Sequence, residues 1–453
     1  MDQTKTSRRS FLTMVAMAPV AAAAVSSCGT SGPSSSSGGS TGGGGGNATA
    51  SMWYLSGEPN ETIKNENISS WNDANPDQTL DITFFQNDAY KTKLRTAIGA
   101  GQAPTLIYGW GGGILASYAE ADQVLDLTSW FDENPDVKGR VLESTYGAAT
   151  VDGKIYALPN ENASPIIFYY NRDLFEQVGI EPPATWDDLM AAVQTFNDND
   201  IAPIALGGQS RWTSMMWLEY LYDRVGGPEV FNAIYAGEPD AWSAPGSIQA
   251  LTMIQELVQA GGFITGFESI TADSNADIAL MYTGRTAMML HGSWTYSGMK
   301  GDGGDFVPSG SLQWIEFPTV EGGAGDPKNM VGNPAQYMSI STAADAEAQE
   351  AAKAYLADPE NGIMSDSVIQ AYIDSGQVCI ATGIDDLIAE SEDADFLQFA
   401  YGLVQDAPNF QQSWDQALSP ATSEELLTNI DQLFSLSITP QQFADNMNQT
   451  LGQ

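Results

Sequence analysis

The sequence predicts an α/β fold with largely parallel sheets, arranged in more than one lobe. From Met52 onward, short apolar runs that end in Gly, Asn or Ser alternate with amphipathic helical segments. Strands that alternate with helices are typical of α/β units with parallel sheets. Hydrophobic residues make up 43% of the chain. A body of about 400 residues with this composition can bury a large core and is long enough for two lobes.

The first 27 residues are expected to be an export signal and not part of the fold. Arg8 and Arg9 form a twin-arginine pattern ahead of an apolar run over 11–25. This run is shorter than the roughly 20 residues that a membrane-spanning helix needs. The sequence "VSSC" (25–28) follows and resembles a bacterial lipobox, so Cys28 is expected to become the lipidated first residue of the mature chain. The alternative is an ordinary signal with an unrelated cysteine nearby.

Residues 28–50 are expected to form a flexible tether. Their Gly- and Ser-rich composition buries little apolar surface and behaves as a coil. With a lipid at Cys28, the protein would be anchored to a membrane and would not span it. Cys379 is the other cysteine of the sequence. No disulfide is therefore expected within the mature body.

Six apolar runs are predicted to be strands, and they cover residues 80–86, 105–110, 165–171, 202–208, 287–292 and 336–341. In the first run Leu80, Ile82 and Phe84 share one face, which is typical of a half-buried strand. Ligands of open α/β sheets bind beyond the carboxyl ends of the strands. Aromatic and polar residues follow several of these runs, so one shared cleft is expected there.

Three helices have recognisable ends. Thr185 is a plausible N-cap for a helix over 185–200. The helical pattern over 247–262 stops at two glycines. Thr439 is the expected N-cap of a C-terminal helix whose first residue is Pro440.

The chain is strongly acidic. The expected signal contains three basic residues (Lys5, Arg8, Arg9) and one acidic residue (Asp2), so the remainder keeps 14 Lys and Arg against 56 Asp and Glu, a net charge of −42. Such a surface repels nucleic acid, anionic lipid and anionic metabolites. It favours neutral or cationic ligands, although most of the charge is expected to be a solvated acidic surface.

His291 is the only histidine in the sequence. A Ser-His-Asp triad, a histidine zinc site or a histidine general base would each need it, and we expect it to be a structural residue. The segment "DSNADI" (273–278) begins like a calcium-binding loop, but Ile278 replaces the required glycine and Gly284 replaces the required glutamate. No metal or other cofactor is therefore expected.

Two sequence blocks carry a family resemblance. The segment "YNRDLFEQVGIEPPATWDDL" (170–189) resembles the signature of the family 1 extracellular solute-binding proteins of bacterial ABC importers, the maltose- and oligosaccharide-binding type. The segment "YTGRTAMMLHGSW" (282–294) resembles their second block. Residues 101–113, "GQAPTLIYGWGGG", are similar to an early strand and loop of the family, and residues 355–362 with the helix at 439–443 fit its C-terminal part.

The resemblance implies two discontinuous α/β lobes joined by a hinge, as in periplasmic binding proteins, with the ligand in the cleft between them. We expect residues 51–160 plus 284–330 in lobe 1 and residues 161–283 plus 331–453 in lobe 2. The resemblance further implies a monomer that is not an enzyme, that captures a neutral oligosaccharide and that delivers it to the importer's permease. An anchored form fits the outer face of the cytoplasmic membrane in a Gram-positive bacterium.

Sugars expose apolar C–H faces and a rim of hydroxyls, so aromatic rings, carboxylates and amides bind them. The family's Gly-x-Trp block marks Trp294 as the stacking residue. The other expected ligand contacts are Trp110, Trp212, Trp414, Asp415, Glu58, Asn87, Asp88, Asn160, Glu161 and Asn333. For each of them, the alternative is a core aromatic or a turn or cap residue.

Two other functions stay open at this point. A secreted glycoside hydrolase would need a pair of carboxylates across the cleft, one of them with a raised pKa, and no pattern in the sequence nominates such a pair. A binder of another solute, such as a peptide, a metal complex or a polyol, is the third possibility.

Overall fold

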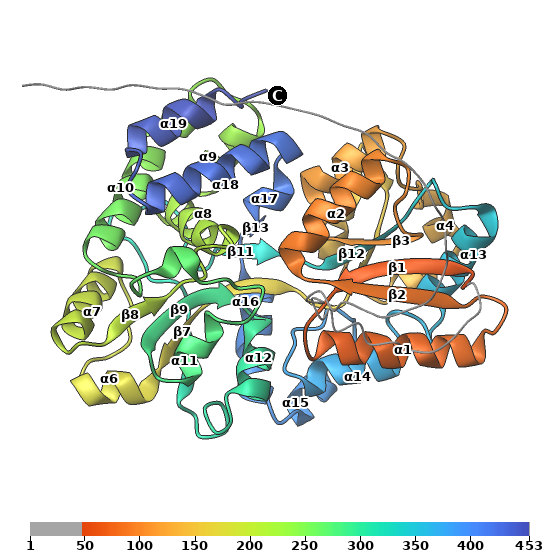
Figure 1. Ribbon diagram of the computed structural model, residues 1–453, viewed down its shortest axis with the longest axis horizontal. Helices are drawn as coiled ribbons and strands as arrows, with labels where there is room; N and C mark the ends of the chain where they lie inside the picture. Colours follow the sequence, from red (N-terminus) through yellow and green to blue (C-terminus); the bar gives the residue numbers. More distant parts are fainter. Residues whose placement is uncertain (1–47, 453) are drawn as a thin grey trace, which may run out of the picture. The chain divides into compact units, whose positions relative to one another are not determined.

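Two separate mixed β-sheets organise residues 48–452, the part of the chain that the computed structural model describes (Figure 1). Each sheet is covered by helices and forms the centre of one lobe, called the first and the second lobe below. The expected export signal, the lipobox residue Cys28 and almost all of the expected tether lie outside the described residues.

The first lobe is built on a five-stranded sheet. Its strand order is β2 (Leu80–Phe85), β1 (Ala50–Leu55), β3 (Leu106–Gly109), β12 (Gln336–Ile340) and β6 (Leu158–Asn160). Helices α1 (Asn60–Ala74) and α14 (Asp366–Asp374) lie on one side of the sheet, and α2 (Asn87–Gly99) and α3 (Gly112–Glu120) lie on the other (Figure 1). The remaining elements are α4 (Thr128–Glu133), α5 (Pro135–Lys138), η1 (Glu143–Ala149), the hairpin β4 (Thr150–Val151) and β5 (Lys154–Ile155), and α13 (Ala346–Ala357).

The second lobe is built on a six-stranded sheet. Its path is β13 (Phe410–Gln412), β11 (Met330–Asn333), β7 (Ser164–Asn171), β9 (Thr286–Gly292) and β8 (Ala202–Ala205), with β10 (Leu312–Ile315) also paired to β7. Helices α8 (Trp212–Gly226), α10 (Pro245–Gln259), α18 (Pro420–Phe434) and α19 (Pro440–Asn448) pack together on one side. The other elements are α6 (Arg172–Val178), α7 (Trp186–Asp198), α9 (Pro228–Tyr235), η2 (Ala241–Ser243), η3 (Phe267–Ser269), α11 (Ile278–Tyr282), α12 (Thr295–Asp302), α16 (Ala394–Asp406) and α17 (Trp414–Ala417). Helix α15 (Asp385–Glu390) lies in the segment that connects α14 to α16.

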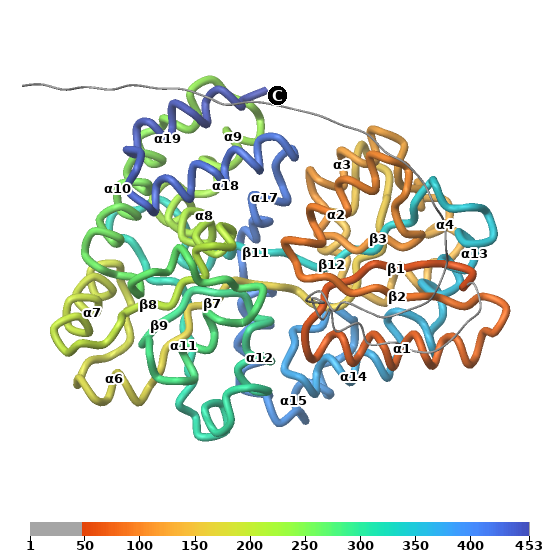
Figure 2. The backbone as a smooth tube through the Cα atoms, viewed as in Figure 1, coloured from red at the N-terminus to blue at the C-terminus, as the bar shows by residue number. Residues whose placement is uncertain are grey.

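Within the described residues, the chain crosses between the lobes three times (Figure 2). The crossings are residues 160–164 between β6 and β7, residues 333–336 between β11 and β12, and residues 375–393 between α14 and α16. The first and third crossings are hydrogen-bonded to each other. The Ala163 N–H donates to the Val378 carbonyl, and the Ile380 N–H donates to the Glu161 carbonyl, both at 2.9 Å.

The lobe division expected from the sequence differs from the sheets after residue 283. Strands β9 and β10 fall within 284–330, which was expected in the first lobe, but both pair with β7 of the second sheet. Strand β12 falls within 331–453, which was expected in the second lobe, but it pairs with β3 and β6 of the first sheet. Pairing between distant segments decides sheet membership, and the order of blocks along the sequence does not reveal it.

The sheets are mixed, whereas the sequence predicted largely parallel ones. Strand β1 is parallel to β2 and β3, but β12 is antiparallel to β3 and β6. Strand β7 is antiparallel to β9, β10 and β11. Strands β6, β7, β11 and β12 adjoin the crossings, so the chain enters each sheet there from the other lobe and not through a helix of the same lobe.

Local predictions for strands and helix ends are confirmed. Each of the six predicted runs overlaps a strand, namely β2, β3, β7, β8, β9 or β12. Helix α7 has the predicted cap, because the Asp188 N–H donates to the Thr185 hydroxyl and the Thr185 N–H donates to the Asp188 carboxylate. Helix α19 starts at Pro440 with Thr439 as its cap. Helix α10 ends at Gln259, and Gly261 follows with a left-handed φ of 69°.

A fully buried ion pair lies beside the first crossing. The Lys64 ammonium lies 3.1 Å from the Glu161 carboxylate, and both residues are 0% exposed. The Tyr54 hydroxyl donates to the same carboxylate at 2.5 Å. Burial and, after it, the charge of Glu161 raise the pKa of Tyr54, so the phenol keeps its proton. Glu161 also has a φ of 63°, which costs a non-glycine residue about 1–3 kcal/mol. The ion pair therefore holds the chain in a strained turn where it leaves β6.

Removing one partner of this pair is expected to destabilise the fold. Lys64→Met should lower the free energy of unfolding by about 3–5 kcal/mol, because it leaves the Glu161 carboxylate buried without a counter-charge. Urea unfolding followed by far-UV circular dichroism measures the loss. Lys353→Met is the matched control, since its partner Glu350 is largely exposed, and it should change stability by less than about 0.5 kcal/mol.

A double variant separates lost charge pairing from lost packing. Lys64→Met combined with Glu161→Gln should recover part of the stability, because the unpaired charge is gone. If Lys64→Met costs no more than Lys353→Met, the ion pair does not hold the crossing.

Candidate functional site

A cavity lies between the lobes and is lined by both of them. Its empty volume is about 1480 Å³ with the opening to solvent included. The first lobe contributes the loop after β1, the start of α2 and the end of β3. The second lobe contributes the start of α8, the loop before α11 and the end of β9. Residues of all three crossings complete the lining. The strand ends of both sheets thus converge on one space, as expected for α/β sheets.

Trp294 is placed by the glycine two residues before it. A Cβ atom at Gly292 would overlap the six-membered part of the Trp294 indole. The glycine therefore allows the ring to lie against the end of β9. Trp294 is half-buried and lines the cavity, and the hydroxyl of Ser297 donates to its carbonyl at 2.8 Å. The glycine of the Gly-x-Trp block is thus required because any side chain at this position would collide with the tryptophan ring.

Trp212 and His291 pack beside Trp294. The Trp212 and Trp294 ring centroids are 6.1 Å apart, and His291 contacts both rings edge-on at 5.5 and 5.4 Å. His291 is itself fixed by two bonds. Its Nδ1 accepts from the Gly292 N–H at 2.9 Å, and its Nε2 donates to the Asp277 carboxylate at 3.2 Å. The histidine therefore has the structural role predicted for it, and it supports the two indoles of the second lobe.

Trp110 belongs to the first lobe and lines the same cavity. Its ring is packed edge-on against Tyr108 at 5.2 Å, and its carbonyl accepts from the Gln412 side chain at 2.6 Å. The Lys91 ammonium lies 4.9 Å from its ring centroid. The same ammonium forms an ion pair of 3.1 Å with Asp415 of the second lobe. Trp110 therefore lies beside direct contacts between the lobes.

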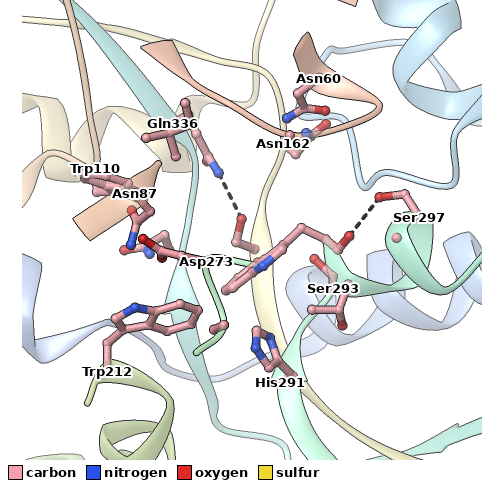
Figure 3. A pocket seen from close by; sticks show the side chains of 18 of the residues that line it. Asn60, Asn87, Trp110, Asn162, Trp212, Asp273, His291, Ser293, Ser297 and Gln336 are labelled. Atoms are coloured by element: carbon pink, nitrogen blue, oxygen red, sulfur yellow. Dashed lines mark hydrogen bonds between the residues drawn. The ribbon is translucent and has the colours of Figure 1, made fainter. Parts of the chain in front are cut away.

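Three side-chain oxygens in the cavity wall are buried and have no hydrogen-bond partner in the described structure. They are Oδ1 of Asn162, Asp273 and Asn333. Asn162 lies on the first crossing and Asn333 on the second, whereas Asp273 lies in the loop before α11. Figure 3 shows Asn162 and Asp273 around the same space as Trp110 and Trp212. An unpaired buried acceptor costs about 1–3 kcal/mol, so these atoms are suited to bind a hydrogen-bond donor of a ligand.

Most of the predicted site residues lie at this cavity. Seven line it: Trp110, Trp212, Trp294, Glu58, Asn87, Asn333 and Asp415. Glu58 is exposed in the loop after β1, and Asn87 begins α2. Asp88 is the next residue of α2 and lines a second cavity instead. Its backbone N–H donates to Asp273 of the opposite lobe at 3.0 Å.

Three predicted residues are not brought to either of these two cavities. Trp414 is 1% exposed and packs in an aromatic cluster with Tyr222, Phe231 and Trp242. It is a core residue, and its neighbour Asp415 reaches the cavity instead. Glu161 is turned into the first lobe by its ion pair with Lys64, and Asn160 is fully buried beside it.

Sequence reasoning missed several lining residues. Asn162 lies one residue beyond the predicted pair of Asn160 and Glu161, and the left-handed backbone of Glu161 decides which side chain faces the cavity. Asp273 belongs to the "DSNADI" segment, whose pattern indicates only an incomplete calcium-binding loop. The signal that could have identified Asp273 is its place in a polar loop ahead of the Gly-x-Trp block. Gln377 of the third crossing also lines the cavity and binds Asn60 and Asn162.

Residues 48–452 contain no group of three His, Cys, Asp or Glu side chains placed to hold a metal ion. In the same residues, no helix combines the length and the apolar character that crossing a bilayer requires. Cys379 is buried and forms no disulfide, and burial raises the pKa of its thiol to about 12. The cavity lining combines indoles, amides and carboxylates with the Lys91 ammonium, His291 and several hydroxyls.

A family model described as bacterial extracellular solute-binding protein matches residues 39–362, more than half of the chain. The chain therefore belongs to this family of extracellular proteins, as its sequence blocks predicted. The family fits the export that the N-terminal residues predict.

Solved and curated relatives extend the comparison. A structure from work on xylan utilization by the thermophilic bacterium Caldanaerobius polysaccharolyticus has a TM-score of 0.80 and 28% identity, and the match covers 89% of this chain and 100% of that one. An uncharacterized ABC transporter extracellular-binding protein of Pyrococcus horikoshii is 25% identical over 215 residues, 47% of each chain. The xylose/arabinose-binding protein XacG of Haloferax volcanii is 26% identical over 217 residues, 47% of this chain and 45% of that one. The matches thus span about half the length of these curated relatives.

The ion pair between Lys91 and Asp415 is expected to hold the two lobes together. Lys91→Met should lower the ratio of closed to open molecules by about fivefold, since a partly exposed pair is worth up to about 1 kcal/mol. Small-angle X-ray scattering without ligand should then give a larger radius of gyration. Lys93→Met is the control on the same helix, because the Lys93 ammonium lies over the rings of Trp53 and Phe85 of its own lobe. Equal radii for the two variants would contradict this role.

Proposed function

We propose that this protein is the solute-binding component of an ABC importer and captures a neutral oligosaccharide between its lobes. The observation that carries the proposal is the meeting of three indoles in one cavity, Trp110 from the first lobe and Trp212 and Trp294 from the second. Indole faces bind the C–H faces of sugars at a low cost in side-chain entropy. Rings from both lobes can therefore hold a sugar only when the lobes are close together.

The polar groups of the cavity suit hydroxyls. The unpartnered oxygens of Asn162, Asp273 and Asn333 accept hydrogen bonds, and sugar hydroxyls donate them. The net charge of −42 outside the expected signal disfavours anionic ligands. A neutral, hydroxyl-rich ligand satisfies both conditions.

The relatives narrow the sugars to be tested first. One solved relative comes from work on xylan utilization, and one curated relative is named for xylose and arabinose. Both names favour ligands made of pentose units, so xylo- and arabinoxylo-oligosaccharides come before gluco- and galacto-oligosaccharides.

The cellular role completes the proposal. The N-terminal signal and Cys28 favour a lipid-anchored monomer on the outer face of the cytoplasmic membrane, in a Gram-positive bacterium. Closure of the lobes around the sugar would present a changed surface to the permease subunits. Residues 51–160 plus 336–374 and residues 164–333 plus 394–453 are the units proposed to move, with the three crossings between them.

The glycoside hydrolase is the weaker alternative. A hydrolase needs two free carboxylates flanking the scissile bond. Of the four carboxylates that line the cavity, Asp277 is engaged by His291 and Asp415 by Lys91, so Glu58 and Asp273 are left for such a pair. Incubation with each oligosaccharide, followed by chromatography of the products, tests this point. If shortened products form over many catalytic turnovers, the protein is a glycoside hydrolase and the proposed binding function is wrong.

The proposal is tested by isothermal titration calorimetry with the four oligosaccharide classes named above. Binding of at least one of these classes by the protein supports the proposed function. The proposal would be overturned if the protein bound none of the four classes and a thermal-shift panel showed that it binds a peptide, a polyol or a metal complex instead. A ligand present at 100 times its dissociation constant should stabilise the fold by about 2.7 kcal/mol.

Trp294→Ala is expected to weaken sugar binding by roughly 1–3 kcal/mol, as for other large aromatic contacts. Calorimetry with the best ligand measures the loss, and thermal unfolding checks the fold. Trp130→Ala is the control, because Trp130 packs against Phe131 and lines neither cavity. Gly292→Ala should also weaken binding although it keeps the indole, since the added methyl displaces the ring. Unchanged affinity in Trp294→Ala would show that the ring only fills space.

A further inference from the structure

Helix α2 of the first lobe begins without a cap from its own lobe. The first backbone N–H groups of a helix have no partner within the helix, and the side chain of the residue before it often accepts from one of them. Gln86 holds this position before α2, and its side chain makes no such bond. The Asp88 N–H, in the first turn, instead donates at 3.0 Å to Oδ2 of Asp273 in the second lobe. Figure 3 shows Asp273 next to Asn87, the first residue of α2.

We propose that Asp273 is the N-cap of α2 supplied from the opposite lobe, a contact that forms when the lobes close and that the carboxylate of Asp88 opposes. This contact is called the interlobe cap below. Aspartate is among the best N-cap residues, and the N-terminus of a helix attracts a negative charge. The inference rests on the lobe movement proposed above and not on the identity of the ligand.

The second lobe anchors the loop that carries Asp273. The Gln209 N–H, just before α8, donates to the Ile270 carbonyl at 3.0 Å. The Ala272 N–H donates to the Ser210 hydroxyl at 3.1 Å. The backbone beside Asp273 is thus fixed within its own lobe, so little further order is lost when the carboxylate meets α2. Closure would complete the first turn of α2, and opening would return its N–H groups to water.

Charged groups around Asp88 act in both directions. Burial and, after it, the negative charge of Asp273 raise the pKa of Asp88. The charges of Lys91 and Arg211 lower it, and so does the neighbouring Trp212 indole. The net shift of the pKa is upward, so the closed arrangement favours the protonated acid. The other charged residues of the cavity that Asp88 lines are Arg95, Asp415 and Glu424.

The interlobe cap is therefore expected to strengthen as the pH falls. Opening the lobes separates Asp88 from Asp273 and hydrates it, so its pKa returns toward the ordinary value of 3.8. Between this value and the raised one, the closed form binds more protons than the open form. Closed molecules thus become more frequent as the pH falls through this window, and the gain is complete below it.

Hydrogen exchange of the ligand-free protein tests the interlobe cap, because it reports on the first turn of α2 directly. Asp273→Ala should speed the exchange of the amides at 87–90 by about three- to tenfold, although these amides lie in the other lobe. Asp273→Asn should keep most of the protection, since an amide oxygen also caps a helix. The amides of α11, which follows Asp273 in its own lobe, should exchange as in the wild type.

Glu268→Ala is the matched control for these variants. Glu268 is an exposed acid ahead of Asp273 in the same lobe, and it lines neither cavity. Thermal unfolding checks that each variant folds. Equal exchange of α2 in Asp273→Ala and Glu268→Ala would overturn the interlobe cap. Exchange in Asp273→Asn as fast as in Asp273→Ala would also overturn it, because charge alone would then explain the contact.

Small-angle X-ray scattering without ligand tests the opposition by Asp88. Asp88→Asn should raise the ratio of closed to open molecules at neutral pH by about two- to fivefold, as for other partly exposed charge pairs. The radius of gyration of the wild type should decrease between neutral pH and about pH 4, close to the ordinary pKa of an aspartate. Asp88→Asn should lose most of this decrease. Asp81→Asn should keep it, because it removes an exposed acid of the same lobe that lines neither cavity.

The outcomes separate this inference from the proposed function, since none of these measurements uses a sugar. Equal pH responses of Asp88→Asn and Asp81→Asn would show that Asp88 does not oppose the interlobe cap. Unchanged exchange of α2 in Asp273→Ala would overturn the cap and leave sugar capture standing. Failure of the wild type to bind any oligosaccharide would overturn the proposed function instead and leave the cap standing.

Discussion

The site depends on chain crossings that hold two lobes side by side while leaving space between them. Residues 161–163 of the first crossing bond to residues 378–380 of the third, and the buried Lys64–Glu161 pair ties this junction to the first lobe. A buried ion pair adds little net stability compared with apolar packing. The ion pair instead fixes the direction of the chain, because Glu161 is held in a left-handed turn that places Asn162 in the wall of the cavity.

The indoles of the cavity are positioned by small residues and by one histidine. Gly292 makes room for Trp294, and His291 packs edge-on against both Trp294 and Trp212. On the opposite lobe, Trp110 is held by Tyr108 and by Lys91, and Lys91 also reaches Asp415 across the gap. The proposed sugar contacts and the contacts between the lobes therefore involve the same side chains, so in the proposed function ligand binding and lobe closure would be coupled.

Local sequence patterns predicted much of the fold. The capping residues Thr185 and Thr439, the glycines after α10 and the apolar strand runs act over a few neighbours, so a single stretch of sequence contains the whole signal. The same holds for Trp294, whose position follows from a glycine two residues away. Lobe membership after residue 283 and the direction of the strands at the crossings were predicted incorrectly, because strand pairing joins segments far apart in the chain.

The sequence by itself determined the alternation of strands and helices, the acidic charge, the single histidine and the aromatic residues at strand ends. Only the tertiary structure decided which of these residues face the shared space. Trp414 follows a strand end as the other candidates do, yet it packs among Tyr222, Phe231 and Trp242. Asp273 lies in a loop without a recognised motif, yet its carboxylate faces the cavity. The physical reason is that burial and side-chain orientation depend on packing partners from distant segments, which local periodicity does not encode.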